Sequence, residues 1–366
     1  MPTRDPRHGP LTGRGALSNP DGRFEERRHE RFDDGWGTAE EVPPPLATEL
    51  RPEPGRTLIT RHDSPDIPSS QSINPYRGCE HGCIYCYARP SHAYVNLSPG
   101  LDFETKIFYK AEAAARLEAQ LRRKGYVCEP ITIGANTDPY QPAERKLRVT
   151  RSILETLRRF HHPCALITKS TLVARDLDIL AEMARERLVQ VMVSITSLDP
   201  AVKRTLEPRA ASPAARLKTI QLLAEAGVPV GVMVAPVIPV ITDWEMERIL
   251  AAAAQAGAVR AGYVLLRLPY EVKDLFREWL AAHAPLKAAH VMSLIRQARG
   301  GKDYDARFGA RMRGRGEYAD LLARRFALAC RRHGLNRTVP LLDTTRFRVP
   351  PEDTPQGDLF ERHTSS

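Results

Sequence analysis

Three cysteines stand close together in the segment INPYRGCEHGCIYCYARP. Cys79, Cys83 and Cys86 have the spacing C-x3-C-x2-C, so one short loop offers three thiolates. Cysteine thiolates are the usual protein ligands of iron–sulfur clusters. A [4Fe-4S] cluster has four irons, and three cysteine ligands therefore leave one iron with an open coordination site. The spacing predicts a cluster with one iron free to bind another molecule.

A zinc ion is the alternative for these cysteines, because Zn²⁺ accepts both Cys and His ligands and His81 or His92 could supply the fourth. Structural zinc sites usually pair two short ligand motifs, and no second C-x2-C or H-x3-H motif follows in the sequence. Cys128, Cys164 and Cys330 are isolated, and we expect them to be buried small residues. This pattern favours the cluster over zinc.

The composition is that of a globular protein of 366 residues, with 42% hydrophobic and 27% charged residues. It contains no run of 18 apolar residues, and its basic N-terminus is not followed by an apolar segment, so we expect a cytoplasmic protein without membrane association. Six cysteines are too few for a disulfide framework in a chain of this length. The net charge of +10 is compatible with a nucleic-acid partner, although solvated surface arginines would give the same charge.

Short β-rich runs alternate with amphipathic helical stretches from about residue 71, which is typical of βα units and a parallel sheet. Strands are expected at 106–110, 131–136, 165–170, 189–196, 229–236 and 262–269. Helical patterns lie between them, for example at 111–124 and at 214–226, where Gly227 follows as a helix C-terminus signal. Six such units suffice for an open or partial barrel. In parallel α/β barrels the functional groups lie on the loops that follow the strands, so we expect site residues there.

The flanking segments differ from this central region. Residues 1–70 are rich in Arg, Asp, Glu, Gly and Pro and lack apolar periodicity, so the segment is predicted to be largely disordered. The predicted partial barrel spans 71–300. A basic helical extension at 301–348 and a flexible, Pro-rich acidic tail at 349–366 are expected after it.

Beyond the cysteine loop, residues 70 to 350 resemble the spore photoproduct lyase group of radical S-adenosylmethionine (SAM) proteins, and more closely its DNA repair photolyase-like relatives. The resemblance rests on the strings NPYRGCEHGCIYCYAR, GANTDPYQPAE, LITKST, VSITSLD followed by LEPR, and VMVAPVIP. It implies an α/β fold, a partial (β/α)6 TIM-type barrel with a helical C-terminal extension. It also implies an enzyme that uses a [4Fe-4S] cluster and an electron donor such as flavodoxin or ferredoxin to cleave SAM to a 5′-deoxyadenosyl radical.

The resemblance further implies which residues bind SAM. Tyr85 is the aromatic residue before the third cysteine, and the strings LITKS and VSIT place Lys169 and Ser194 at two cofactor-contacting positions of the lyase. Thr137 aligns with a further hydroxyl contact, and Arg216 is a weaker candidate. Lys169 would neutralise the SAM carboxylate, while the hydroxyls would hydrogen-bond the cofactor. A lysine at the barrel rim with its ammonium in solvent is the alternative interpretation of Lys169.

One position departs from the lyase pattern. The lyase carries a cysteine after its second barrel strand that donates a hydrogen atom to the product radical, and this chain has Asn136 at that position. An amide does not readily donate a hydrogen atom. Repair by the same route would therefore need a substitute donor, and the weak candidates are Tyr140, Cys128 and Cys164, if one of them faces the cavity. We expect both cysteines to be buried beside strands instead.

The C-terminal tail contains the peptide QGDLF, formed by Gln356, Gly357, Asp358, Leu359 and Phe360. This peptide resembles the Q-x-[S/D]-L-F motif with which bacterial repair and replication proteins bind the sliding clamp. Gly357 replaces a leucine often seen there, which should weaken docking. The prolines around it favour an exposed peptide, and extended peptides in tails commonly serve as docking segments. Packing of Leu359 and Phe360 back onto the barrel is the alternative.

The sequence therefore supports a radical SAM enzyme that acts on nucleic acid, in DNA lesion repair or base modification. Modification of a protein or a small molecule by the same chemistry is an alternative, because an open barrel could admit these substrates as well. A non-catalytic, zinc-stabilised accessory protein is the alternative from a different class.

Overall fold

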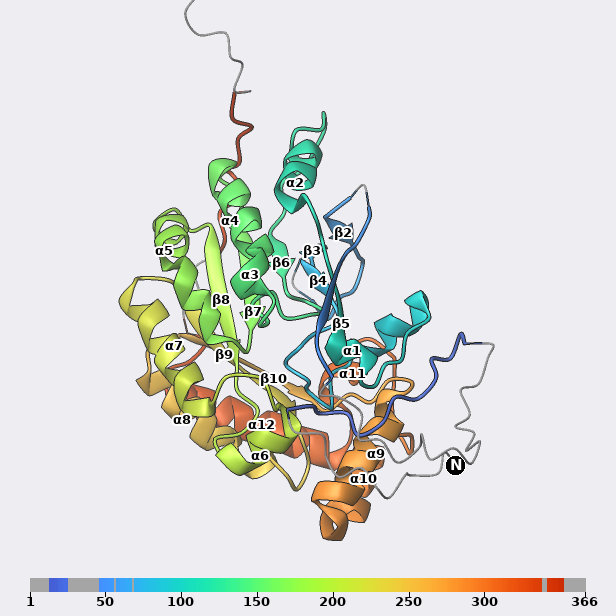
Figure 1. Ribbon diagram of the computed structural model, residues 1–366. Coiled ribbons are helices and arrows are strands. Elements are labelled where there is room, and N and C mark those ends of the chain that lie inside the picture. The colour runs from blue at the N-terminus through green and yellow to red at the C-terminus, as the bar shows by residue number, and fades with distance from the viewer. Residues whose placement is uncertain (1–12, 26–45, 56, 68, 338–340, 352–366) are drawn as a thin grey trace, which may run out of the picture.

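The computed structural model describes residues 13–25, 46–55, 57–67, 69–337 and 341–351 (Figure 1). Within these ranges, no helix is both long enough and apolar enough to cross a lipid bilayer. The main sheet has seven strands in the order β10-β9-β8-β7-β6-β3-β2. Its two edge strands, β10 and β2, do not pair with each other, so the sheet is an open, partial barrel.

Six strands of this sheet are parallel to their neighbours. They are β3 (Gln71–Ile73), β6 (Ile131–Ile133), β7 (Cys164–Thr168), β8 (Val189–Ser194), β9 (Val230–Val237) and β10 (Arg260–Leu265). The remaining strand, β2 (Thr60–Arg61), runs antiparallel to β3. The strands β6 to β9 are mostly buried and rich in Val, Ile and Leu, as expected for parallel strands covered on both faces. The loops after β7, β8, β9 and β10 lie toward the lower end of the sheet in Figure 1.

Helices alternate with these strands and cover the sheet. Those between successive strands of the sheet are α1 (Asp102–Thr105), α2 (Ala113–Leu121), α3 (Glu144–Leu147), α4 (Val149–Arg159), α5 (Leu177–Arg185), α6 (Pro200–Leu206), α7 (Pro213–Glu225) and α8 (Met246–Gln255), with the 3-10 turns η2 (Arg89–Val95), η3 (Thr171–Asp176) and η4 (Asp243–Glu245). The helix predicted at 214–226 is α7. The Ser212 side chain accepts a hydrogen bond from the Ala215 amide at its N-terminus, and Gly227 follows its C-terminus with a φ of 76°.

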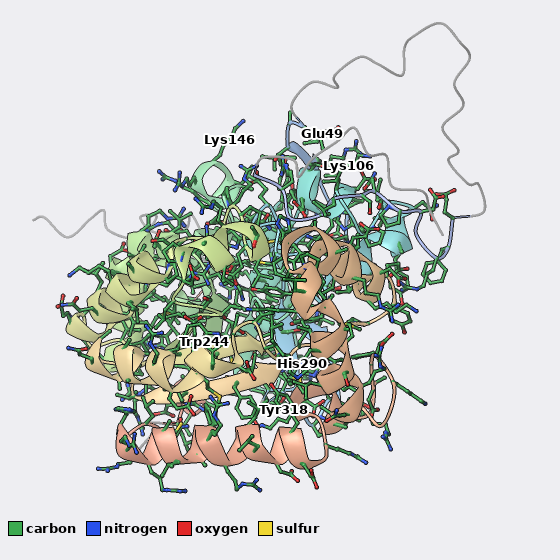
Figure 2. The ribbon with its side chains drawn as sticks, turned by 90° about the horizontal axis from the view of Figure 1, so that it is seen from below. Glu49, Lys106, Lys146, Trp244, His290 and Tyr318 are labelled. Atoms are coloured by element: carbon green, nitrogen blue, oxygen red, sulfur yellow. The ribbon has the colours of Figure 1, made fainter. Side chains whose placement is uncertain are left out.

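The region after β10 is helical. It comprises α9 (Val272–His283), η5 (Pro285–Lys287), α10 (Ala288–Gln297), α11 (Ala310–Arg313) and α12 (Glu317–Arg332). The basic helix α12 packs against α8, and Arg325 binds the Glu247 carboxylate at 2.7 Å. At the start of α12, the Tyr318 hydroxyl donates to Asp243 at 2.8 Å. Figure 2 labels Tyr318 on this helix and Trp244 on the neighbouring segment.

One predicted strand belongs to a different sheet. Residues 106–110 form β5 (Lys106–Tyr109), which lies in a three-stranded sheet between β1 (Glu49–Pro52) and β4 (Tyr76–Arg77). The first parallel strand of the main sheet is β3, which the sequence analysis missed. A three-residue strand is too short to show a recognisable period, whereas 106–110 has the composition of a strand without indicating its partner.

The prediction of a largely disordered segment at 1–70 is wrong for its described parts. β1 and β2 pair with strands of the two sheets, and residues 13–25 pack along the cysteine loop. Ala16 is fully buried there, and the amides of Gly15 and Ala16 donate to the Glu104 carboxylate. These contacts are made by backbone amides and by polar side chains, such as Ser18 with Glu278 at 2.7 Å and Arg23 with Glu271 at 3.2 Å. They leave no apolar periodicity in the sequence, so the composition alone could not reveal them.

Candidate cofactor site at the cysteine loop

The three cysteines lie on the loop between β4 and η2, and this loop is fixed by backbone contacts. The Cys79 amide donates to the Phe103 carbonyl at 2.9 Å, and the Ile84 amide donates to the Leu206 carbonyl at 3.1 Å. These bonds connect the loop to α1 on one side and to the end of α6 on the other. Gly82 has a φ of 67°, a conformation that residues with a side chain rarely adopt.

The buried Gln141 side chain holds the start of this loop. Its Oε1 accepts from the Glu80 amide at 3.0 Å, and its Nε2 donates to the Gly78 carbonyl at 3.0 Å. Gln141 follows β6, so a residue of the next βα unit fixes the position of the first cysteine. A buried side-chain amide with both ends satisfied is rigid, which keeps the loop in one conformation.

A buried ion pair supports the loop from behind. The Arg89 guanidinium donates to the Cys83 carbonyl at 3.0 Å and lies 2.5 Å from Glu104, and both side chains are fully buried. Glu104 also accepts from the amides of Gly15 at 3.0 Å and Ala16 at 2.8 Å. The position of the cysteines thus depends on a residue of η2, a residue of α1 and the N-terminal segment.

All three thiols are free cysteines, and two of them are buried. Burial raises the pKa of each, to about 12 for Cys83, where the neighbouring Glu207 carboxylate adds to the effect. Cys86 packs against both the buried cluster that contains Cys83 and the buried cluster that contains Cys79, so the three residues lie near one another. Three mutually close thiols on one rigid loop are a donor set of the kind that binds an iron–sulfur cluster.

The two histidines considered as zinc ligands make other contacts. His81 Nδ1 lies 3.4 Å from Asp138 Oδ2, and His92 Nε2 lies 2.9 Å from the Lys106 carbonyl oxygen. In the described part of the chain, no group of three His, Cys, Asp or Glu side chains has a geometry that could hold a single metal ion. These contacts do not favour either histidine as the fourth ligand of a zinc ion.

Tyr85 belongs to a buried network on the other side of the loop. Its hydroxyl donates to the Glu207 carboxylate and lies 3.1 Å from the Thr196 hydroxyl, which itself donates to Glu207 at 2.7 Å. Burial alone would raise the pKa of Glu207, but the charges of Arg216 and Lys169 and the hydrogen bonds lower it to about 2. Glu207 lies in the string LEPR and Thr196 in VSIT, but neither string by itself marks them as site residues.

Arg216 does not have the position expected of a SAM ligand. It is 1% exposed, its Nε donates to the Ala211 carbonyl at 2.9 Å, and its Nη1 donates to the Ser194 carbonyl at 3.0 Å. Its Nη2 forms an ion pair with Glu207. The guanidinium thus holds the carboxylate that supports Tyr85, and we correct its predicted role from SAM binding to support. Sequence spacing could not distinguish these roles, because both need an arginine near the same strand end.

Lys169 lies beside the cysteine loop. It follows β7, its Nζ is 3.5 Å from the Ala235 carbonyl oxygen and 5.9 Å from the centroid of the Tyr85 ring, and its charge lowers the pKa of both Cys83 and Cys86. Ser194 ends the next strand, β8, and is buried. A cationic and a hydroxyl side chain therefore lie at adjacent strand ends near the thiols.

Asp138 connects three loops of the site, and the sequence analysis did not single it out. Its carboxylate accepts from the Lys169 amide and the Thr168 hydroxyl, both at 2.7 Å, and from the Tyr140 amide at 2.9 Å. Burial would raise the pKa of Asp138, but His81 and these hydrogen bonds lower it to about 2. The neighbouring Thr137 hydroxyl donates to the Tyr76 carbonyl at 2.6 Å, so Thr137 also fixes a loop.

None of the weak candidates for hydrogen donation is suitably placed. Cys128 precedes β6 and Cys164 begins β7, so both lie at the amino ends of strands, opposite the edge that carries Lys169. The Tyr140 hydroxyl is fully buried and donates to Asp176 at 3.0 Å. These three assignments are therefore corrected: burial of the two thiols is confirmed only for Cys164, and Cys128 is half-buried.

Comparison with known proteins agrees with this geometry. Residues 73–253 match the family model of the radical SAM superfamily. An uncharacterized protein of Mycobacterium tuberculosis is 38% identical over 233 residues, which cover 63% of this chain and 68% of that protein. The chain belongs to the radical SAM superfamily. An uncharacterized protein of Methanocaldococcus jannaschii is 27% identical to this radical SAM protein over 173 residues, 47% of this chain and 62% of that one.

Among solved structures, spore photoproduct lyase complexed with dinucleoside spore photoproduct has the same fold. The TM-score is 0.56 at 18% sequence identity, over 78% of this chain and 80% of that chain. Radical SAM enzymes use a [4Fe-4S] cluster and SAM. The thiol set of Cys79, Cys83 and Cys86 fits the cluster, and the ammonium of Lys169 fits the carboxylate of SAM.

Proposed function

We propose that this radical SAM enzyme holds its [4Fe-4S] cluster through Cys79, Cys83 and Cys86 and acts on nucleic acid, in lesion repair or base modification. The observation that supports the cofactor part is the location of the Lys169 ammonium 5.9 Å from the Tyr85 ring, on the loop that brings the three cysteines together. When bound, the cluster supplies the electron, received from a donor such as flavodoxin or ferredoxin, that breaks the S–C5′ bond of SAM. The residues around it bind and orient SAM.

Several residues around the cysteine loop would each contribute to binding and orienting SAM. The Lys169 ammonium would neutralise the SAM carboxylate, and the Ser194 hydroxyl would hydrogen-bond the cofactor. Tyr85 is held by Glu207, so its ring forms a fixed wall beside Cys83. Asp138 orders the Lys169 backbone, which limits the positions its ammonium can reach. These fixed polar groups orient SAM before electron transfer and so reduce the entropy lost on reaching the reactive geometry.

The nucleic-acid part is supported by the fold shared with spore photoproduct lyase, whose structure contains a dinucleoside spore photoproduct, and by the net charge of +10. The residue at position 136 is asparagine. Of the described cysteines outside the cysteine loop, Cys128 and Cys164 lie at the amino ends of β6 and β7 and Cys330 lies on α12, so none of them follows β6 or β7 as the lyase cysteine does. A product radical would then have to receive its hydrogen atom from a different donor than the cysteine of the lyase. This favours another lesion or a base modification over reversal of the same dimer.

Reaction with DNA tests this proposal. Anaerobic enzyme with dithionite and SAM should form more 5′-deoxyadenosine when ultraviolet-irradiated or unirradiated DNA is added, and mass spectrometry of the digested DNA should show an altered nucleoside. The modification of a protein or a small molecule is the competing outcome. The nucleic-acid substrate would be rejected if SAM is cleaved but added DNA neither raises the 5′-deoxyadenosine yield nor contains an altered nucleoside. A protein or a small molecule would then be the better candidate substrate.

The clamp-binding peptide lies outside the described residues, but the segment before it has a defined position. Phe347 packs with Tyr126 and His162, and Arg122 at the end of α2 donates to the Pro350 carbonyl at 2.8 Å. This segment rises toward the amino ends of the strands, the upper side in Figure 1. A clamp bound to residues 356–360 could therefore leave the carboxyl ends of the strands, where the cysteine loop lies, free for the substrate.

We expect the full chain to co-elute with a bacterial sliding clamp in gel filtration, through Gln356, Asp358, Leu359 and Phe360. Replacement of both Leu359 and Phe360 by alanine should abolish the complex, because these two side chains would fill the apolar pocket. Thr364→Ala serves as the control, because it leaves Gln356, Leu359 and Phe360 intact. Equal co-elution of all three proteins would show that the peptide is not the contact.

A further inference from the structure

Arg267 is a partly buried arginine without an acidic partner at the edge of the sheet that carries the cysteine loop. It lies two residues after β10, and its guanidinium carbon is 4.5 Å from the centroid of the Tyr87 ring. Tyr87 directly follows Cys86, and its hydroxyl donates to the Ala135 carbonyl after β6. The guanidinium therefore lies near the third cysteine, on the side of the loop that faces β10.

The hydrogen-bonding capacity of Arg267 is largely unused. Its Nε is buried without a hydrogen-bond partner. Nη2 lies 3.5 Å from the Tyr304 hydroxyl and Nη1 lies 3.6 Å from the Met312 sulfur, both of them weak contacts. Among the residues that the structure describes, no carboxylate oxygen lies within 4.0 Å of this guanidinium.

The three fully buried arginines of the fold are different. Arg89 and Arg216 are each neutralised by a buried glutamate and also donate to carbonyl groups. Arg299 donates to three carbonyls, those of Ala310, Leu265 and Leu266. Burial and the neighbouring charge of Arg267 lower the pKa of Arg299 to about 10. Arg267 and Arg299 thus lie close enough to repel each other. Tyr304 and Asp305 offset part of this charge at Arg299, and an anion beside Arg267 would reduce the repulsion further.

We infer that Arg267 binds a phosphate group of the substrate, with the Tyr304 hydroxyl as a second donor. This inference rests on the proposed nucleic-acid function and names the contact that would place the strand next to the cysteine loop. A guanidinium offers two parallel N–H donors that match two oxygens of a phosphate, and its stacking on Tyr87 fixes its plane. Backbone phosphates are the usual targets of such arginines in nucleic-acid complexes, where they determine the register of the strand.

Binding of a fluorescein-labelled single-stranded oligodeoxynucleotide, followed by anisotropy, tests this contact. Arg267→Gln should weaken binding about tenfold, the loss expected for one hydrogen bond to a charged group. The slope of log K against log salt should fall by about 0.7. Arg158→Gln is the matched control, because this exposed arginine on α4 pairs with Glu182 and its loss removes the same charge. We expect that control to stay within about twofold of wild type. Iron content and thermal midpoint verify that each variant is folded and loaded.

Separate results would contradict the phosphate contact of Arg267 and the nucleic-acid function on which it rests. Equal oligonucleotide affinity of Arg267→Gln and wild type would reject the phosphate contact and leave the nucleic-acid function standing. A loss of SAM affinity of the same size would assign Arg267 to the SAM carboxylate and also reject it. If wild type binds no oligonucleotide, the nucleic-acid function fails. Calorimetric titration with pyrophosphate then decides the anion site, which is rejected if wild type and Arg267→Gln bind pyrophosphate alike.

Discussion

Replacement of Cys83 by alanine should abolish iron binding and SAM cleavage together. Cys83 is one of three thiols on a single loop, and two thiolates do not retain a [4Fe-4S] cluster that needs at least three protein ligands. Anaerobic reconstitution with iron and sulfide should give brown wild-type protein and a colourless variant. With dithionite and SAM, only the wild type should release 5′-deoxyadenosine, as measured by chromatography.

Cys128→Ala is the control for this experiment. Cys128 is half-buried before β6, at the opposite edge of the sheet, so its loss should leave the iron content and the 5′-deoxyadenosine yield unchanged. If Cys83→Ala retains iron and activity, the cluster assignment fails. If wild type takes up zinc and no iron, the zinc-stabilised accessory protein becomes the better account.

The same assay separates the role of Lys169 from that of the cysteines. Lys169→Met keeps the length of the side chain but removes the ammonium, so iron content should be retained while the SAM dissociation constant rises about tenfold or more. Lys169→Arg should recover part of the affinity because it restores the charge. Unchanged SAM affinity in Lys169→Met would indicate a rim lysine that makes no cofactor contact.

The features that could be predicted from the sequence are those that depend on residues close together in the chain. The three cysteines lie within eight residues, Lys169 directly follows β7 and Ser194 ends β8, and both strands have a clear apolar pattern. Five of the six predicted strands form the main sheet for the same reason. The sixth, at 106–110, has strand composition but pairs with β1 and β4, and composition says nothing about partners.

The features that the sequence did not reveal depend on contacts between distant segments. Asp138 is one acid among many in the sequence, and only the packing of the loops after β6 and β7 brings its carboxylate to the Lys169 amide. Arg216 and Glu207 are nine residues apart, yet their burial under Tyr85 decides that they bind each other. The N-terminal segment lacks any apolar periodic signal because it binds through the amides of Gly15 and Ala16 and through polar side chains such as Ser18 and Arg23.

The contact with that segment predicts a large loss of stability on removal of Glu104. Glu104→Ala would leave the fully buried Arg89 without its counter-charge and two buried amides without an acceptor. Breaking a buried ion pair in this way costs about 3–5 kcal/mol of the free energy of unfolding. Chemical denaturation should show this loss. Trypsin should also cut faster at Arg14 and Arg23, since the segment that carries them would lose its two hydrogen bonds to the Glu104 carboxylate on α1.

Glu49→Ala is the matched control, because Glu49 pairs with Arg51 on the outer edge of the fold and both side chains are about half exposed (Figure 2). An exposed pair contributes little, so the control should stay within about 1 kcal/mol of wild type. Equal stability of the two variants would mean that the Arg89–Glu104 pair does not anchor the loop. A destabilised Glu104→Ala with unchanged trypsin cleavage would show instead that the side-chain contacts of Ser18, Asn19 and Arg23 suffice to hold residues 13–25. Faster cleavage together with lower iron retention would show that the N-terminal segment is part of the support for the cluster.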